Sequence, residues 1–134
     1  MQISCDWIER IDSTNSELKR RSSQSVLPEG YVVSANQQTA GRGRSGHSWQ
    51  SPAGTSISTS MLLHPDTLPM EAVPRLTLLA AMATVLAIEE ETGIESRIKW
   101  PNDIVIAGRK AAGILTEMAA EGGRARYVLV GIGI

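Results

Sequence analysis

Residues 31–63, YVVSANQQTAGRGRSGHSWQSPAGTSISTSMLL, contain two stretches of strand-forming residues separated by a long loop. Residues 31–35 are rich in β-branched and aromatic side chains, and residues 55–63 alternate in polarity, so both are predicted to be strands. The segment from Gln37 to Gly54 shows no apolar period. Compact domains rarely hold a loop of this length without a functional reason. The sequence therefore predicts a sheet with a functional loop between two of its strands.

Two helices and three more strands are predicted around this pair. The cluster Asp12-Ser13-Thr14-Asn15 favours a helix N-cap, and a short helix is expected over residues 17–21. The clearest helix is expected over residues 71–92, with Pro74 in its first turn and Gly93 as its stop. Mixed strands with two helices predict an α+β fold, in which a mixed β-sheet is flanked by helices. The three further strands are expected over residues 97–99, 110–118 and 127–134.

The helix over residues 71–92 is apolar enough to pack across the sheet. Its most apolar part, residues 76–88, is shorter than the roughly 20 residues that a membrane span needs, so no membrane association is expected. One stripe is expected to face the sheet, namely Val73, Leu76, Leu79, Ala80, Ala83, Leu86 and Ala87, widened by Leu78, Met82 and Val85.

Composition and charge describe an ordinary globular domain. The chain has 134 residues, which predicts one domain, and a formal net charge of -1, which gives no broad surface for nucleic acid or anionic membranes. Cys5 is the one cysteine, so no internal disulfide can form. The first residues carry neither a basic nor an apolar signal region. A cytoplasmic protein is expected, and any anion site must be local.

The strongest chemical feature is the segment from Gln38 to Gly46, QTAGRGRSG. Its glycines let the backbone approach a ligand and offer N–H groups to anionic oxygens, and Arg42 and Arg44 add forked donors suited to phosphate or carboxylate. A solvated hairpin loop and an RNA-binding tail are the alternatives. The segment lacks the Gly-Lys-Ser/Thr of a phosphate-binding P-loop, and it precedes a strand instead of opening a helix as dinucleotide-binding loops do. An anion cradle is the favoured interpretation.

Three further segments carry candidate groups. Lys99-Trp100-Pro101-Asn102-Asp103 is either a strand end with a buried Trp or a cluster that converges on a pocket. Lys110 is either solvated or placed beside a ligand, because the small residues 111–113 that follow it leave room. The hydroxyls and amide of residues 13–15 serve as a helix N-cap or bind a neutral polar group such as a urea. His47 and His64 lack metal-ligand spacing, so no metal site within the protein is predicted.

Together these segments resemble a known family, the biotin protein ligases. Each segment alone is a weak to moderate indication of the family. Five segments in the right order, from residue 12 to the final residue, are a specific one. The resemblance implies the ligase fold related to class II aminoacyl-tRNA synthetases. The segments that carry it are Asp12-Ser13-Thr14-Asn15, then residues 38–46 with Trp49, Lys99-Trp100-Pro101-Asn102-Asp103, residues 110–115, and Gly131-Ile132-Gly133-Ile134.

The resemblance also implies roles for individual residues. Lys110 and Arg44 are expected to be catalytic, with Lys110 bridging the biotin carboxylate and the α-phosphate, while Trp49 is expected to cover the adenine. The expected biotin-binding residues are Ser13, Thr14, Asn15, Gln38, Arg42, Gly43, Arg44, Lys110 and Gly113. The expected nucleotide and phosphate residues are Gly41, Arg42, Arg44, Gly46, Trp49, Asn102, Asp103, Gly131 and Gly133.

The implied activity is ATP-dependent conversion of biotin to biotinyl-5'-AMP, followed by transfer to a lysine of a biotin carboxyl carrier protein. ATP and biotin are then substrates, Mg²⁺ accompanies the ATP, and a homodimer is a further expectation because relatives often dimerise. Residues 1–134 are expected to be a catalytic domain that is incomplete at its C-terminus, without an N-terminal winged helix or a C-terminal β-barrel. A lipoate or octanoate acyltransferase, and a fragment that only binds biotin, remain the alternatives.

Overall fold

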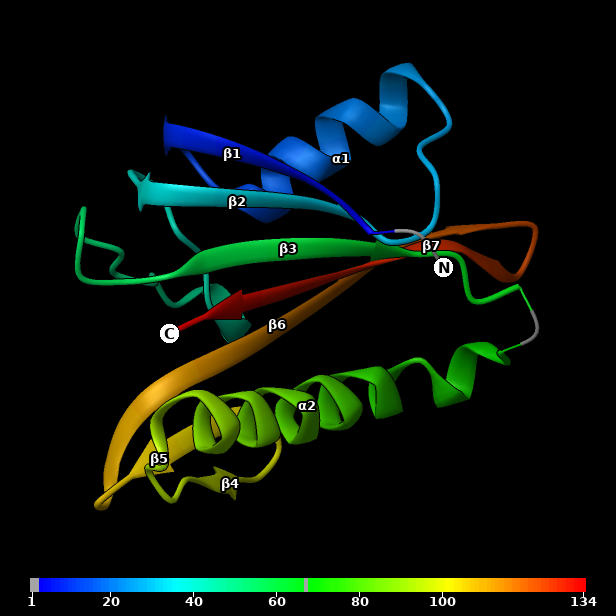
Figure 1. Ribbon diagram of the computed structural model, residues 1–134. Helices are drawn as coiled ribbons and strands as arrows, with labels where there is room; N and C mark the ends of the chain where they lie inside the picture. Colours follow the sequence, from blue (N-terminus) through cyan, green and yellow to red (C-terminus); the bar gives the residue numbers. More distant parts are fainter. Residues whose placement is uncertain (1–2, 67) are drawn as a thin grey trace.

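The computed structural model describes residues 3–66 and 68–134, which form one seven-stranded sheet with two α-helices (Figure 1). The strand order is β1-β2-β3-β7-β6-β5-β4, so the C-terminal strand lies at the centre of the sheet. The strands are β1 (Ser4–Ile11), β2 (Tyr31–Gln38), β3 (Ser58–Leu63), β4 (Arg97–Lys99), β5 (Asp103–Ile106), β6 (Arg109–Glu121) and β7 (Arg124–Gly133). The helices are α1 (Thr14–Gln24), α2 (Pro74–Thr92) and the 3₁₀ turns η1 (Arg44–Gly46) and η2 (Met70–Ala72).

The sheet is mixed, which confirms the predicted α+β class. Strands β1 and β2 are parallel, and all other neighbouring pairs are antiparallel. Two strands, β1 and β5, were not predicted. β1 is an edge strand whose residues are mostly exposed and include several charges, and β5 has only four residues, so neither carries a strong apolar pattern.

The two helices cover opposite faces of the sheet. Leu129 of β7 belongs to the core under α1 together with Leu18 and Leu62, whereas its neighbours Val128 and Val130 belong to the core under α2. Because successive strand residues point to opposite faces, this alternation places one helix on each side. α1 packs against β2, β3 and β7, and α2 packs mainly against β6. Each helix therefore leaves part of its sheet face uncovered.

The predicted buried stripe of α2 is confirmed only in part. Val73 is buried and Leu76, Ala80 and Val85 pack against the core, but the other predicted positions are exposed. Ala81 and Thr84 are the buried residues of the helix, whereas Leu79 and Leu86 are 58% and 63% exposed. The helix is apolar on nearly every side, so its pattern does not select one face. The predicted ends are confirmed, with Pro74 in the first turn and Gly93 as a left-handed C-cap at φ 69°.

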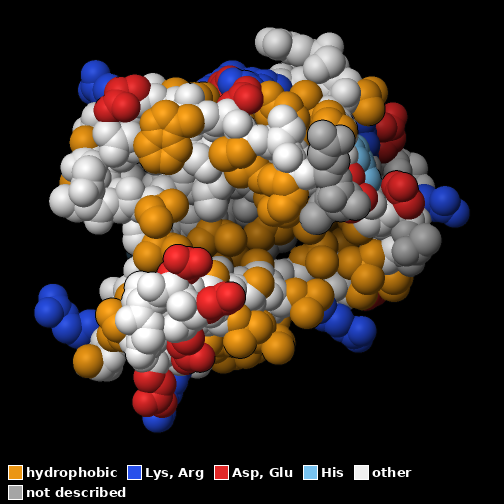
Figure 2. Space-filling model, in the orientation of Figure 1, with side chains coloured by type: hydrophobic (Ala, Val, Ile, Leu, Met, Phe, Trp, Pro, Cys, Tyr) orange, Lys and Arg blue, Asp and Glu red, His pale blue; other side chains and the backbone are white. Residues whose placement is uncertain are grey.

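Apolar side chains remain on the solvent side of α2. Figure 2 shows hydrophobic side chains gathered over this helix and in the hollow between it and the strands above it. Met70–Thr92 spans 23 residues, long and apolar enough to cross a membrane by length and composition. The expectation that the apolar stretch is too short for a span is therefore wrong. Core helices of soluble proteins can have the same length and apolar composition, so these two properties do not show that the helix crosses a membrane.

The orientation of α2 can be tested by two substitutions on opposite sides of the helix. We expect Ala81→Leu to lower the free energy of unfolding by about 1–3 kcal/mol, because the added carbons enter a filled core. Leu86→Ala should change it by no more than about 0.5 kcal/mol. Urea denaturation of both variants measures the two effects. A larger loss for Leu86→Ala would mean that the predicted stripe is the buried one.

Candidate functional site

One pocket gathers residues from widely separated parts of the chain. It lies where the start of α1 and the loop after β2 meet strands β6 and β7. Its lining residues are Ser13, Thr14, Asn15, Gln38, Arg42, Gly43, Arg44, Trp49, Asn102, Lys110, Gly113, Ile114, Leu115, Gly131, Ile132 and Gly133.

The start of α1 forms one wall of the pocket. Ser13 is the N-cap, and its hydroxyl accepts a weak hydrogen bond from the Ser16 N–H at 3.4 Å. The Thr14 N–H donates to Oε1 of Gln38 at 2.8 Å. Ser13, Thr14 and Asn15 are all buried. The N-cap interpretation is confirmed, and it is compatible with ligand binding because the same residues line the pocket.

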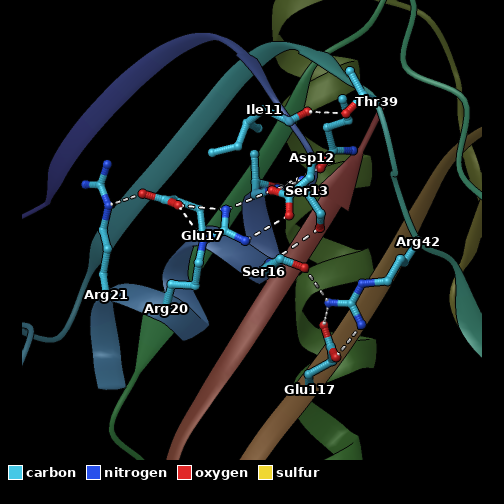
Figure 3. Close-up of polar contacts among 12 residues, drawn as sticks. Ile11, Asp12, Ser13, Ser16, Glu17, Arg20, Arg21, Thr39, Arg42 and Glu117 are labelled. Carbon is cyan, nitrogen blue, oxygen red and sulfur yellow. Dashed lines mark hydrogen bonds and ion pairs between the residues drawn. The ribbon is translucent and has the colours of Figure 1, made fainter. Parts of the chain in front are cut away.

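Asp12 stabilises the turn into α1. Its Oδ1 accepts the Ser13 N–H at 2.7 Å, and Arg20 places both terminal nitrogens 2.8 Å from the carboxylate (Figure 3). The hydrogen bond from Arg20 is the main reason that the pKa of Asp12 falls to about 2. Backbone bonds from Thr39 and Ala40 to the carbonyls of Ile11 and Asp12 attach the following loop to this turn.

A buried hydroxyl lies behind that wall and was missed by the sequence analysis. Ser60 Oγ is 2.7 Å from Thr14 Oγ1 and donates to Asn15 Oδ1 at 2.6 Å. Ser58 and Ser60 are 1% and 0% exposed, so the buried face of β3 is the one that carries serines, opposite to the face of Thr59 and Met61. The sequence signal that could have revealed this face is the pair of small polar residues, Ser58 and Ser60, at alternate positions of the predicted strand.

The glycine-arginine loop is folded as a hairpin. The Gly43 N–H donates to the His47 carbonyl at 2.7 Å, and the Trp49 N–H donates to the Gly41 carbonyl at 2.8 Å. A methyl group at Gly41 would lie 2.5 Å from the Trp49 carbonyl oxygen, so glycine is required there. The Gly43 N–H is therefore not free to bind an anion, and this part of the sequence expectation is wrong. Arg42 and Arg44 remain the candidate anion-binding groups of the loop.

Trp49 fills much of the pocket. A Cβ at Gly133 would lie 2.4 Å from its indole, and a Cβ at Gly113 would lie 3.0 Å from it. Lys110 Nζ stands 5.2 Å from the centre of the ring, within cation–π range. The buried Nε1 finds no hydrogen-bond partner among residues 3–66 and 68–134. About 50 Å³ of free space remains, so a larger ligand requires Trp49 to move.

Each cation of the site is held by a partner. Lys110 Nζ lies 2.8 Å from Asp103 Oδ1, and Arg44 donates to Asn102 Oδ1 at 3.2 Å. Asn102 also donates to the Ile114 carbonyl at 3.0 Å, which fixes the turn between β4 and β5 to β6. Asn102 and Asp103, expected to bind nucleotide, thus contact the two expected catalytic residues. They position the cations in this structure.

Most of the expected site residues lie together, and a few do not. Gly41, Gly46 and Asp103 do not line the pocket, although Gly46 lies in the adjoining surface hollow. Trp100 is 79% exposed, which contradicts the buried strand-end alternative, and its bond to Pro101 is cis. Trp100 and Pro101 instead line a second, apolar cavity of about 600 Å³ against α2.

No metal site is formed by the described part of the chain. Residues 3–66 and 68–134 contain no group of three or more His, Cys, Asp or Glu side chains that could hold an ion. Asp103 and Glu117, whose carboxylates contact residues of the pocket, are occupied by Lys110 and Arg42. A cation at this site would therefore depend on ligand oxygens.

The pocket combines apolar surface with hydroxyl, amide and cationic groups, a composition that suits a small organic acid. Residues 7–134 match the Biotin/lipoate A/B protein ligase family. The chain belongs to this family, and the resemblance noted in the sequence is confirmed.

Two relatives illustrate the match. The chain is 55% identical over 107 residues to the bifunctional ligase/repressor BirA of Bacillus subtilis, covering 80% of this chain and 33% of that protein. It is 33% identical over 132 residues to the biotin–[acetyl-CoA-carboxylase] ligase of Mycobacterium tuberculosis, covering 96% of this chain and 48% of that one. The chain thus spans half or less of the length of these relatives.

Solved structures support the same fold. The biotin protein ligase of Aquifex aeolicus in complex with biotin and ATP has a TM-score of 0.82 at 34% identity, covering 98% of this chain and 51% of that one. The biotin protein ligase of Leishmania major in complex with biotinyl-5-AMP has a TM-score of 0.84 at 27% identity, covering 100% and 57%. The expected ligase-type fold is confirmed.

The packing of Trp49 on Gly133 can be tested by fluorescence. Gly133→Ala should shift the tryptophan emission to the red, because the new methyl group expels the indole from its buried position. Trp7 and Trp100 are already exposed, so the shift would report Trp49. Gly43→Ala is the control, since its added carbon meets nothing closer than 3.5 Å. Unchanged emission in Gly133→Ala would mean that the indole does not lie on this glycine.

The pairing of Asp12 with Arg20 predicts a pH dependence. Because the folded pKa of Asp12 is lowered to about 2 from its ordinary value of 3.8, its contribution to stability is complete above pH 4 and is lost as the pH falls towards 2. Arg20→Gln should return the pKa towards 3.8, as measured by NMR titration of the carboxyl carbon. Arg97→Gln, which removes only an exposed pair with Glu95, should leave the pKa of Asp12 unchanged.

Proposed function

We propose that this chain binds biotin in the pocket and provides the biotin-activating site of a biotin protein ligase. The whole protein would convert biotin and ATP to biotinyl-5'-AMP and pyrophosphate, then transfer biotin to a lysine of a biotin carboxyl carrier protein. The observation that carries the proposal is the convergence of five separated sequence segments on one pocket. Relatives named as biotin ligases support biotin as the substrate over lipoate.

The two ends of the pocket suit the two ends of biotin. Thr14, Asn15 and Gln38 offer hydroxyl and amide groups to the polar ureido ring. Gly113, Gly131 and Gly133 carry no side chains on adjacent strands, so a flat ring could approach the backbone there once Trp49 moves aside. Lys110 and Arg44 lie at the cationic end, where a carboxylate would bind.

The chemistry requires positive charge at that cationic end. A biotin carboxylate oxygen attacks the α-phosphorus of ATP, the bond to pyrophosphate breaks, and a mixed anhydride forms. Both reactants are anions, so Lys110 and Arg44 offset their repulsion and stabilise the charge that develops. The amine of the acceptor lysine then attacks the acyl carbon, loses its proton, and AMP leaves. The loop that carries Arg42, Arg44 and Trp49 would exclude water from the anhydride.

The ion pair between Lys110 and Asp103 fits this role. Asp103 keeps the ammonium at the edge of the pocket before a ligand arrives. The side chain of Lys110 is about half exposed, so a ligand carboxylate can compete for it at modest cost. Mg²⁺ would bind through the phosphates of ATP, since the described residues offer no carboxylate cluster for it.

The chain spans half or less of the length of the relatives described above, so the complete reaction is proposed for the whole protein. Residues 1–134 are proposed to supply the biotin-binding part of the catalytic domain. Binding of biotin without transfer is the second candidate. A carboxylase carrier protein is the proposed acceptor, and a homodimer and a cytoplasmic location stay predictions.

The catalytic proposal predicts a loss of pyrophosphate release in Lys110→Ala. We expect the rate with biotin and ATP to fall by about two orders of magnitude or more, because one preorganised cation is removed from the reacting oxygens. Arg44→Ala should have a similar effect. Lys19→Ala, on the exposed side of α1, is the matched control and should retain the full rate. Equal rates in Lys110→Ala and the unaltered chain would exclude this mechanism.

The choice of substrate has its own measurement. Calorimetry of the 134-residue chain with biotin and with lipoate compares the two acids directly. Binding of lipoate alone would reverse the assignment. Binding of biotin without pyrophosphate release or transfer would favour the binding-only candidate.

A further inference from the structure

Glu117 of β6 contacts two separate parts of the site, the start of α1 and the glycine-arginine loop. Its Oε2 accepts a hydrogen bond from Asn15 Nδ2 at 2.8 Å and another from Arg42 Nη2 at 2.8 Å. Its Oε1 accepts from Arg42 Nη1 at 2.9 Å. One carboxylate thus joins the wall of the pocket at the start of α1 to the glycine-arginine loop. Figure 3 shows its pairing with Arg42, which also contacts Ser16 of α1.

The carboxylate of Glu117 is ionised at neutral pH. Partial burial raises its pKa, but the hydrogen bonds from Arg42 and Asn15 outweigh burial, and the pKa lies below its ordinary value. An ionised carboxylate can only accept hydrogen bonds. Whatever group of Asn15 faces Glu117 must therefore be its NH₂.

This requirement fixes the amide of Asn15. With its Nδ2 directed at Glu117, its Oδ1 must point the other way, where the Ser60 hydroxyl donates to it at 2.6 Å. A Cβ at Gly131 would lie 2.5 Å from this same Oδ1, so the oxygen lies against the pocket wall. The reversed amide would place two oxygens together at Glu117. A ligand head group therefore meets an amide with one defined polarity.

The same carboxylate restrains the loop. Its two oxygens receive both terminal nitrogens of Arg42, a forked geometry that is stronger and more directional than a single bond. Arg42 also donates to Ser16 Oγ at 3.3 Å. Arg42 lies two residues before Arg44, so an anchored Arg42 limits where Arg44 can reach.

We propose that Glu117 is a positioning residue, which sets the polarity of the Asn15 amide in the pocket and anchors the Arg42 loop beside it. This proposal rests on the proposed function, because its affinity test uses biotin as the ligand. Glu117 acts through its two partners, and the ligand contacts are made by Asn15 and the loop.

The test compares biotin affinities of the 134-residue chain by calorimetry. Glu117→Gln keeps the shape of the side chain, but its amide can donate as well as accept, so the orientation of Asn15 is held only by its weak 3.4 Å bond to the Leu115 carbonyl. We expect Glu117→Gln and Asn15→Ala each to weaken biotin binding by about tenfold. The double variant should be no more than about threefold weaker than the weaker single variant, because the part of the Glu117 effect that passes through Asn15 is already lost and only the part that passes through the Arg42 loop is added.

Three controls separate positioning from general destabilisation. Glu121→Gln removes a mostly exposed carboxylate of the same strand, which pairs with Arg126, and should leave the affinity unchanged. The thermal midpoint of Glu117→Gln should stay within a few degrees of the unaltered chain. In steady-state assays, the KM for biotin should rise more than kcat falls. Unchanged affinity in Glu117→Gln, or multiplied effects in the double variant, would overturn the proposal.

A second readout does not depend on biotin. Hydrogen exchange at the Gly43 and Trp49 amides reports the loop, since both are hydrogen-bonded within the hairpin. Exchange should be faster in Glu117→Gln and in Arg42→Gln, but not in Glu121→Gln. Equal protection in all variants would overturn the anchoring role. If the unaltered chain binds no biotin, the proposed function fails, and this measurement alone decides the proposal about Glu117.

Discussion

The absence of side chains at Gly113, Gly131 and Gly133 sets the shape of the site. Gly113 and Gly133 are register partners on β6 and β7, so they leave one bare patch at the centre of the sheet. Trp49 occupies the space above that patch, and Asn15 occupies the space above Gly131. A methyl group at any of the three positions would displace one of these side chains. The pocket is therefore defined by backbone that side chains from the loop and from α1 can approach.

Each cation of the site contacts a carboxylate or an amide oxygen. Asp103 holds Lys110, Asn102 holds Arg44, and Glu117 holds Arg42. Unpaired cations at close range would repel one another and cost stability. Pairing keeps them near the pocket while leaving them partly exposed, so that an anionic ligand can compete for them. This arrangement suits a protein that must bring together two negatively charged reactants.

Much of the fold and of the site could be predicted from the sequence, because the signals were local. The N-cap at Ser13, the stop at Gly93 and the loop between β2 and β3 are each set by residues a few positions apart. Two features were not predictable in this way. The buried face of α2 could not be chosen because the helix is apolar on nearly every side, and β1 was missed because an edge strand needs no apolar face.

The sequence alone determined the family, the α+β class and most of the residues that line the pocket. These features depend on short motifs, such as glycine turns and helix caps, that can be recognised from neighbouring residues and from their order along the chain. Only the tertiary structure decided which of those residues touch one another. Asn15 and Glu117 are 102 positions apart, yet one hydrogen bond joins them, and Ser60 is buried against both Thr14 and Asn15. Such contacts depend on strand register and on the docking of α1, and no local pattern encodes them.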